Sequence, residues 1–297
     1  MLFERQRLLL TLLDALGEPL GHTDFQKLLF LYTQEWERTP SYEFVPYRFG
    51  GFSFTSYADK RRLIVAALLA DDDQTWELTD EGRAAARRQP VEPLRVLAFC
   101  ARHAELRSNA LIAEVYRRHP YYAARSEIVD AVGLEPEDLA RIAAARPVRQ
   151  PAGLMTIGYE GRSLEGYLNQ LLLAGVTLLC DVRRNPLSRK YGFSKGTLSK
   201  ACEGVGVRYE HLPELGIASE DRRGLGTQVD YDALFIQYER DCLPQQTEAL
   251  ATIRRWVAEG ERVALTCYER LPDQCHRHCV AEALQRELGR AFVPQHL

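Results

Sequence analysis

The spacing of hydrophobic residues divides the chain into two halves with different rhythms. In the first half, apolar residues recur with the period of amphipathic helices. The helices that this spacing predicts cover residues 3–16, residues 23–36 after a cap at Thr23 or Asp24, a segment from about Thr55, and much of residues 90–146. The first half is therefore predicted to be mostly helical.

A short strand and a helix cap interrupt this helical half. Residues 76–78 follow a charged turn and have a strand pattern, and Thr79 or Asp80 is placed to cap the next helix. This order is typical of the end of a winged helix, where a strand returns from the wing. Basic residues open the third helix: Lys60, Arg61 and Arg62. They are candidates for phosphate contacts with nucleic acid, although a solvated charged face explains them equally well.

Strands and helices alternate in the second half. The predicted strands cover residues 154–159, 176–182, 207–212, 262–267 and part of 291–297. The predicted helices cover residues 163–175, 195–206, a long segment from 230 to 260 broken at Pro244, and 275–288. The strands contain few polar residues, as expected when both faces of a sheet are buried. Strict alternation predicts an α/β fold with a mainly parallel sheet and helices on both faces.

The boundary between the halves is expected in the proline- and glycine-containing segment 147–153. We place a helical, winged-helix-like domain at residues 1–148 and the α/β domain at residues 149–297. A chain of 297 residues is long enough for two such domains. The formal net charge of -3 gives no global basic signal, so any nucleic-acid binding would use local patches.

The N-terminal residues do not have the pattern of a signal peptide, because charged residues interrupt the apolar ones. No apolar run is long enough to span a membrane. Seven cysteines in a chain of this size need no disulfide framework. We therefore expect a cytoplasmic protein with free thiols and no membrane partner, and its oligomeric state stays open.

Polar residues follow each of the first four predicted strands of the second half. They are Gly158, Tyr159, Gly161 and Arg162 after the first, Asp181, Arg183 and Arg184 after the second, His211, Glu214 and Gly216 after the third, and Cys267, Glu269, Arg270, Cys275, His276 and Arg277 after the fourth. In open α/β sheets, ligands bind beyond the carboxyl ends of the strands. The pattern predicts one shared site at that edge.

Arginines and glycines at this edge suggest an anionic ligand, either a small molecule or a nucleotide. Gly158 would let backbone amides approach an anion closely, although neither the dinucleotide fingerprint nor the P-loop pattern is present. Asp181 is a candidate general base, and the alternative is a salt bridge from Asp181 to Arg183 or Arg162. Tyr159 is a candidate for stacking on a base or ring, and an ordinary buried aromatic is the alternative.

The stretch LTCYERLPDQCHRHC, residues 265–279, concentrates thiols and histidines. We expect a helix to start at Pro272 or Asp273, so that the dipole of its first turn lowers the pKa of Cys275. A zinc site would use Cys267, Cys275, Cys279 and a histidine, but a CxxC pair is missing. Nucleophilic or redox chemistry at Cys275 or Cys267 is a second interpretation. In the third, Cys275 is a buried framework residue and His276 and Arg277 are the ligand-binding donors. We expect neither a metal nor another cofactor.

Three motifs of the second half resemble the DUF488 family, a domain of unknown function. They are TIGYEGRSLEGYLNQL, CDVRRNPLSRKYGFSKGTLSKACEGVGVRYEHLPELG and VALTCYERLPDQCHRHCVAEAL. The resemblance implies these family residues: Gly158, Tyr159, Asp181, Arg183, Pro186, Leu215, Gly216, Cys267, Glu269, Cys275, His276 and Arg277. Tyr268 departs from the pattern, since a small residue is expected there. In the first half, QKLLFLY and YEFVPYRFGGFSFTSYADKRRL are similar to the winged-helix-like domains of the Panacea antitoxin group.

Three functions fit these residues. The first is a metal-independent hydrolase acting at a glycosidic or phosphate bond of a nucleotide or nucleic acid, guided by the N-terminal domain. In it, Asp181 or Glu269 is the acid/base, His276 orients or shuttles a proton, and Arg162, Arg183 and Arg277 hold phosphate. The second is a DNA-binding regulator whose C-terminal domain senses an anionic small molecule. The third is a cysteine-dependent sulfur or redox enzyme.

Overall fold

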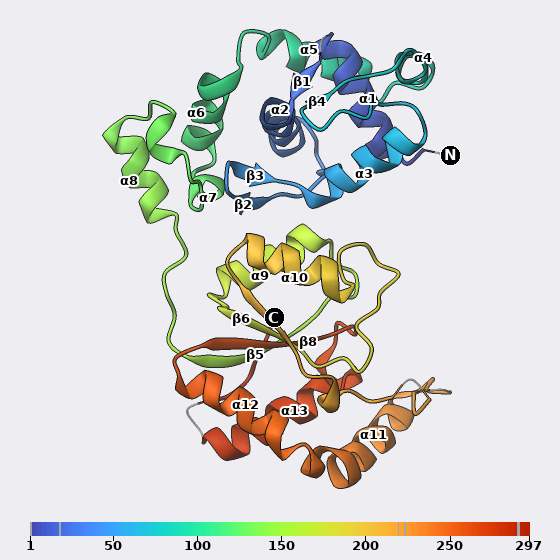
Figure 1. Cartoon of the computed structure of the whole chain (residues 1–297), viewed down its shortest axis with the longest axis vertical. Helices are drawn as coiled ribbons and strands as arrows, with labels where there is room; N and C mark the ends of the chain where they lie inside the picture. The colour runs from blue at the N-terminus through green and yellow to red at the C-terminus, as the bar shows by residue number, and fades with distance from the viewer. Residues whose placement is uncertain (1, 18, 219, 223, 290–291) are drawn as a thin grey trace. The chain divides into compact units, whose positions relative to one another are not determined.

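The computed structural model describes residues 2–17, 19–218, 220–222, 224–289 and 292–297 (Figure 1). The chain forms two compact units, Met1–Arg146 and Pro147–Leu297, each with its own hydrophobic core. The division falls at the start of the proline-containing segment 147–153.

The N-terminal unit is mostly helical, as predicted. Its helices are α1 (Glu4–Leu16), α2 (His22–Glu35), α3 (Phe54–Val65), α4 (Asp80–Arg88), α5 (Pro93–Arg102), α6 (Ser108–Arg118), α7 (Pro120–Ala123) and α8 (Pro136–Ala144), with a 3₁₀ turn η1 (Val129–Ala131). Two antiparallel strand pairs accompany them: β1 (Leu20–Gly21) with β4 (Thr75–Trp76), and β2 (Val45–Tyr47) with β3 (Gly50–Phe52). The likeness to a winged helix stays a prediction.

Local sequence signals set most of the helix ends in this unit. Helix α1 ends at Gly17, whose φ of 81° is the left-handed conformation that glycine adopts without strain. The Thr79 hydroxyl accepts a hydrogen bond from Gly82 N at 2.9 Å and caps α4, as expected. The expected cap of α2 was wrong: the helix begins at His22 with Gly21 as its N-cap, so Thr23 and Asp24 lie in its first turn.

The C-terminal unit alternates strands and helices. Its strands are β5 (Gly153–Gly158), β6 (Leu178–Asp181), β7 (Arg208–His211), β8 (Arg262–Cys267) and β9 (Gln295–His296). Its helices are α9 (Leu164–Leu173), α10 (Lys195–Gly204), α11 (Gln228–Gln237), α12 (Thr247–Ala258) and α13 (Arg277–Leu288). Shorter helical turns are η2 (Pro213–Leu215), η3 (Tyr238–Cys242), η4 (Leu243–Gln245) and η5 (Pro272–Gln274).

The five strands form one parallel sheet in the order β7-β6-β8-β5-β9. Helices α9 and α10 cover one face, and α11, α12 and α13 cover the other (Figure 1). This is the predicted α/β architecture. Leu178, Cys180 and Leu265 pack into the core with α12 and α13. On the opposite face, the Tyr167 hydroxyl of α9 donates to Thr266 Oγ1 at 2.7 Å. Burial of both faces explains why the strands contain so few polar residues.

The helix expected at residues 275–288 begins two residues later. Pro272 starts the separate 3₁₀ turn η5, which the hydrogen bond from Cys275 N to Pro272 O closes at 3.0 Å. Cys275 then has an extended backbone, with φ -143° and ψ 126°, and His276 is the N-cap of α13. Cys275 therefore lies outside the first turn of the helix.

All seven cysteines of the chain are free thiols, and six of them are buried. Within the described part of the chain, every helix is too short or too polar to cross a lipid bilayer.

Candidate functional site

Two polar clusters lie at the carboxyl ends of the adjacent strands β6 and β8, on opposite faces of the sheet. Asp181 pairs with Thr266 in the β6–β8 ladder, so both side chains point to the face that α9 covers. Cys267 follows Thr266 and points the other way, because successive side chains of a strand alternate. The single shared site expected at this edge is thus two sites in the structure.

The first site is the Asp181 cluster, defined as Asp181, Arg183, Tyr159 and Tyr209. Asp181 is fully buried, and Arg183 donates to it from Nε to Oδ1 at 2.8 Å and from Nη2 to Oδ2. The backbone N–H of Arg183 and the Tyr209 hydroxyl add hydrogen bonds of 3.1 and 2.6 Å to the same carboxylate. Of the two expected partners of Asp181, the structure selects Arg183.

The remaining donors of Arg183 also have partners within or beside the cluster. Its Nη1 donates to the Tyr159 hydroxyl and to Phe193 O, both at 2.9 Å. Burial alone would lower the pKa of Arg183, but the hydrogen bonds and charge of Asp181 reverse this effect and raise it. The Tyr159 ring stacks on Phe193 with centroids 4.4 Å apart, so one face of the ring is covered. The cluster is a closed network of matched charges.

Two glycines at this edge allow close backbone contacts. A Cβ atom on Gly158 would lie 1.8 Å from Glu269 O, and one on Gly216 would lie 2.0 Å from Arg184 N. Both glycines are thus required by neighbouring backbone rather than by an approaching anion.

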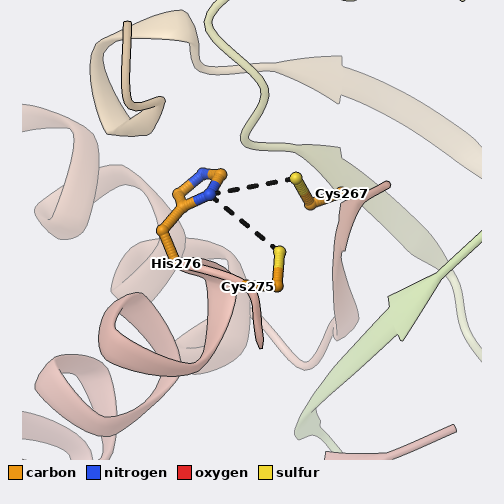
Figure 2. Close-up of side chains that lie close together, drawn as sticks. All are labelled: Cys267, Cys275 and His276. Atoms are coloured by element: carbon orange, nitrogen blue, oxygen red, sulfur yellow. Dashed lines mark hydrogen bonds between the residues drawn. The ribbon is translucent and has the colours of Figure 1, made fainter. Parts of the chain in front are cut away.

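The second site is the thiol centre, defined as Cys267, Cys275, His276, Glu269 and Arg222. Figure 2 shows the His276 ring facing both sulfur atoms, with Nδ1 3.8 Å from Cys267 Sγ and 4.0 Å from Cys275 Sγ. The two cysteines and the histidine are each 1 % exposed. Glu269 Oε2 lies 3.4 Å from Cys267 Sγ. Five groups that can carry charge or share protons therefore meet in one place.

The two thiols of this centre are shifted in opposite directions. The pKa of Cys267 lies well below its usual value, first because of a hydrogen bond from the Cys275 thiol and then because of His276 and Arg222, which together outweigh burial. The pKa of Cys275 is raised well above its usual value by burial, and then by the hydrogen bond and charge of Cys267. The expectation that Cys275 is the acidic thiol was wrong, because Cys275 lies outside the helix dipole and beside a second sulfur.

Arg222 is the member of the thiol centre that the sequence did not reveal. It lies in a segment without helical or strand periodicity, between η2 and α11. Its Nη2 lies 2.9 Å from His276 Nδ1, and its Nη1 lies 3.4 Å from Glu269 Oε1. His276 Nε2 is 3.1 Å from Val182 O, and a carbonyl only accepts, so Nε2 carries a proton.

Glu269 and Arg277 complete the walls of this site. The pKa of Glu269 is raised by burial and then by the charge of Cys267. Arg277 is buried, and its guanidinium donates to the backbone carbonyls of Glu269 at 2.6 Å and Arg270 at 2.9 Å. Arg277 therefore holds the loop that presents Glu269.

Residues 163–284 match the family model described as "Domain of unknown function DUF488". This match lies within the C-terminal unit. The match includes Asp181, Arg183 and every member of the thiol centre, whereas Gly158, Tyr159 and Arg162 precede it. No curated protein and no solved structure was found to match the chain.

The thiol centre has a donor set that suits a soft divalent cation. The ligand atoms of Cys267, Cys275 and His276 all lie within 4.8 Å of one another. In a tetrahedral zinc site, the bond lengths imply sulfur–nitrogen edges of about 3.6 Å. The observed edges of 3.8 and 4.0 Å are close to this value. Cys279 takes no part, because it packs in the core beside α12.

Arg162, in the C-terminal unit, has buried donor atoms without a partner among the described residues. Its Nη2 donates to Leu297 O at 3.0 Å, while Nε and Nη1 are buried without a partner among the described residues. Burial lowers its pKa, and the neighbouring charges of Arg270 and Arg277 add to the effect. The phosphate contact expected for Arg162 stays a prediction.

A cavity of about 220 Å³ lies next to the thiol centre. Its walls include Arg184, Gly216 and Tyr238. The Tyr238 ring also packs edge-on against His276, with centroids 5.9 Å apart. Tyr238 thus contacts both the cavity and the His276 ring of the thiol centre.

The basic residues of α3 in the N-terminal unit divide into one buried and two exposed side chains. Lys60 is 4 % exposed, and its Nζ lies within 3.0 Å of three partners, namely Asp72 O, Thr75 O and His22 Nε2. This placement opposes a phosphate contact by Lys60. Arg61 and Arg62 are exposed. Nucleic-acid binding through them stays a prediction, and a gel shift at two salt concentrations would test it.

Proposed function

We propose that the thiol centre is a metal-independent redox site, in which Cys267 reacts as a thiolate and Cys275 closes a disulfide. The observation that supports this proposal most directly is the geometry: two buried sulfur atoms lie within 4.8 Å of each other and face the same His276 nitrogen. The lowered pKa of Cys267 and the raised pKa of Cys275 agree with this arrangement. A thiolate is the reactive form of cysteine, and a neighbouring protonated thiol is suited to resolve the oxidised product.

We infer that the oxidant is a small peroxide, because Cys267 and Cys275 are each only 1 % exposed and a larger oxidant would not reach their sulfur atoms. The Cys267 thiolate attacks one peroxide oxygen, so an S–O bond forms and the O–O bond breaks. The leaving hydroxide takes up a proton and becomes water, while Cys267 becomes a sulfenic acid. The peroxide is thereby reduced at the expense of one sulfur.

Cys275 then completes the reaction. Its sulfur attacks the Cys267 sulfur, the S–S bond forms, the S–O bond breaks, and the hydroxyl leaves with a proton as a second water. Glu269 lies beside the thiols, with Oε2 3.4 Å from Cys267 Sγ, and its pKa is raised by burial, which suits it to accept the Cys275 proton. A small external thiol is the reductant that reopens the disulfide. Each turnover thus consumes one peroxide and two equivalents of that thiol.

Arg222 supports this metal-independent reading. Its guanidinium already brings a positive charge to His276, Glu269 and Cys267. A hydrolase that uses Asp181 as base, with Arg183 and Arg277 on phosphate, would first have to break the contacts that bind these three residues internally. The thiol reaction needs no such rearrangement of the Asp181 cluster.

Peroxide titration of the reduced chain, followed by peptide mass mapping, tests this proposal. We expect a Cys267–Cys275 disulfide to form before any other cysteine is oxidised. Cys267→Ser should abolish disulfide formation, and Cys275→Ser should leave a sulfenic acid on Cys267. Cys202→Ser is the matched control, because Cys202 is buried and burial raises the pKa of its thiol. Equal oxidation of the chain with and without Cys267 would overturn the proposal.

Zinc binding is the second candidate, favoured by the three donor atoms within 4.8 Å and by Glu269 beside them. It requires Arg222 to leave His276, because the cation and the guanidinium would compete for the same Nδ1 atom. Metal analysis of the purified chain separates the two candidates. One zinc per chain that is lost in both Cys267→Ser and His276→Ala would replace the redox site with a metal site.

A further inference from the structure

Two buried lysines in the N-terminal unit differ sharply in their hydrogen bonding. Lys60 reaches three acceptors within 3.0 Å. Lys27, on α2, is 2 % exposed, and the acceptor within reach of its Nζ is Gly51 O at 3.0 Å. An ammonium group has three donors, and buried donors are nearly always paired. Among the described residues, Lys27 therefore has fewer partners than a buried ammonium group requires.

A cavity of about 230 Å³ lies beside this lysine. Lys27 and its acceptor Gly51 both line it. The remaining wall is largely aromatic: Tyr47 stacks on Phe52 at 4.8 Å, and Phe52 stacks on Tyr57 at 5.0 Å. The polar wall residue Gln26 is already paired with Ser56 Oγ at 2.6 Å and with Ser53 N at 3.0 Å. Lys27 is thus the buried polar group of this wall with unused donors.

We propose that this cavity binds a small aromatic carboxylate, with the ring against Tyr47, Phe52 and Tyr57 and the carboxylate on Lys27. The aromatic walls offer stacked and edge-on contacts to a planar ring. A carboxylate supplies acceptors for the free donors of Lys27 and a charge opposite to its own. The site lies wholly within the N-terminal unit and does not depend on the redox proposal.

The electrostatics of Lys27 agree with an anionic ligand. Burial lowers the pKa of its ammonium group to about 7, and the charge of Asp24 offsets only part of this effect. Burial therefore penalises the positive charge, and a bound carboxylate would compensate it more directly than Asp24 does. Arg48 also lines the cavity, but its side chain is exposed and its Nε lies 3.7 Å from Glu127 Oε1, so its charge is already partly matched.

Calorimetric titration of the full chain with benzoate, and with benzyl alcohol as its neutral analogue, tests the proposal. We expect Lys27→Met to weaken benzoate binding by roughly ten- to a hundredfold, as for loss of a charged hydrogen-bonded contact. Binding of benzyl alcohol should be unchanged in this variant. Tyr47→Ala should weaken both probes, because it removes part of the aromatic wall.

A labelling experiment on the unmodified chain keeps the test valid if Lys27→Met does not fold. Benzoate should slow acetylation of Lys27 by acetic anhydride, and acetylation of the exposed Lys200 should be unaffected. Two results would overturn the proposal of a carboxylate site. One is unchanged labelling of Lys27 at saturating benzoate, and the other is equal benzoate affinity in the unmodified chain and in Lys27→Met.

Discussion

The Asp181 cluster and the thiol centre lie at the ends of adjacent strands, yet they differ in how their buried charges are compensated. In the Asp181 cluster, each buried charge has a partner of fixed geometry, and the carboxylate accepts from Arg183 and Tyr209. In the thiol centre, the sulfurs of Cys267 and Cys275 and the His276 ring can exchange protons, and the Arg222 guanidinium adds a fixed positive charge beside them. Burial and polarity are common to both, so neither property by itself identifies a reactive site.

The comparison shows which property identifies a reactive site better than burial or polarity. It is the presence of buried groups whose protonation and hydrogen bonding are not fully satisfied by fixed partners. A closed network such as Asp181 with Arg183 stabilises one geometry, and its hydrogen-bonding groups are already occupied and have little left to offer a ligand. A centre in which two similar thiols have opposite pKa shifts can pass between protonation and oxidation states at small cost.

Asp181→Asn should have the largest effect on folding. It removes one partner of a buried ion pair and leaves the Arg183 guanidinium uncompensated, which costs about 3–5 kcal/mol. Denaturant unfolding measures this loss. Glu210→Gln, at a partly exposed pair with Arg208, is the matched control and should cost less than about 1 kcal/mol. If Asp181→Asn unfolds like the control, the cluster is not the closed network described above.

The pH dependence of stability should distinguish the thiol centre from the closed cluster. Cys267 has a lowered pKa in the folded chain, so its contribution is present above pH 9 and is lost as the pH falls through its folded pKa. Cys275 has a raised pKa, so its contribution is full below pH 9 and is lost as the pH rises further. Unfolding measured across this range should show a slope below pH 9 that disappears in Cys267→Ser. An unchanged slope would contradict the thiolate assignment.

Tyr209→Phe should have the smallest effect. It deletes the 2.6 Å hydrogen bond from the Tyr209 hydroxyl to Asp181 and leaves the ion pair with Arg183 intact, at a cost of about 1–2 kcal/mol. The rate of disulfide formation at Cys267 should not change, because the two sites lie on opposite faces of the sheet. Altered peroxide reactivity in Tyr209→Phe would show that the sites are coupled.

Local sequence pattern was sufficient to predict the architecture of the C-terminal unit. The apolar run before Asp181 predicts a buried parallel strand, and Ser163 predicts the start of α9, where its hydroxyl accepts from Gly166 N at 2.9 Å. These features depend on neighbours in the sequence. The strand order and the role of each exit residue depend on contacts between distant segments, which periodicity does not encode.

Three residues show what local sequence pattern does not predict. Arg222 reaches His276 across 54 positions from a segment with no periodic pattern, so no local signal identifies it. Lys60 belongs to a basic run typical of an exposed face, but carbonyls of the following turn bury it. Cys275 follows Pro272 and was expected inside a helix, whereas the choice between a 3₁₀ turn and a helix depends on how the loop packs.

The hydrogen bond from His276 to Val182 O has a consequence for the order of folding. It joins residues 94 positions apart, and it forms where β6 and β8 lie side by side. Contacts between such distant segments require costly loop closure and form late. We therefore expect Cys267 to titrate as an ordinary cysteine in the newly made chain and to acquire its acidity only when the sheet closes. The reactivity of Cys267 would then report when folding of the C-terminal unit is complete.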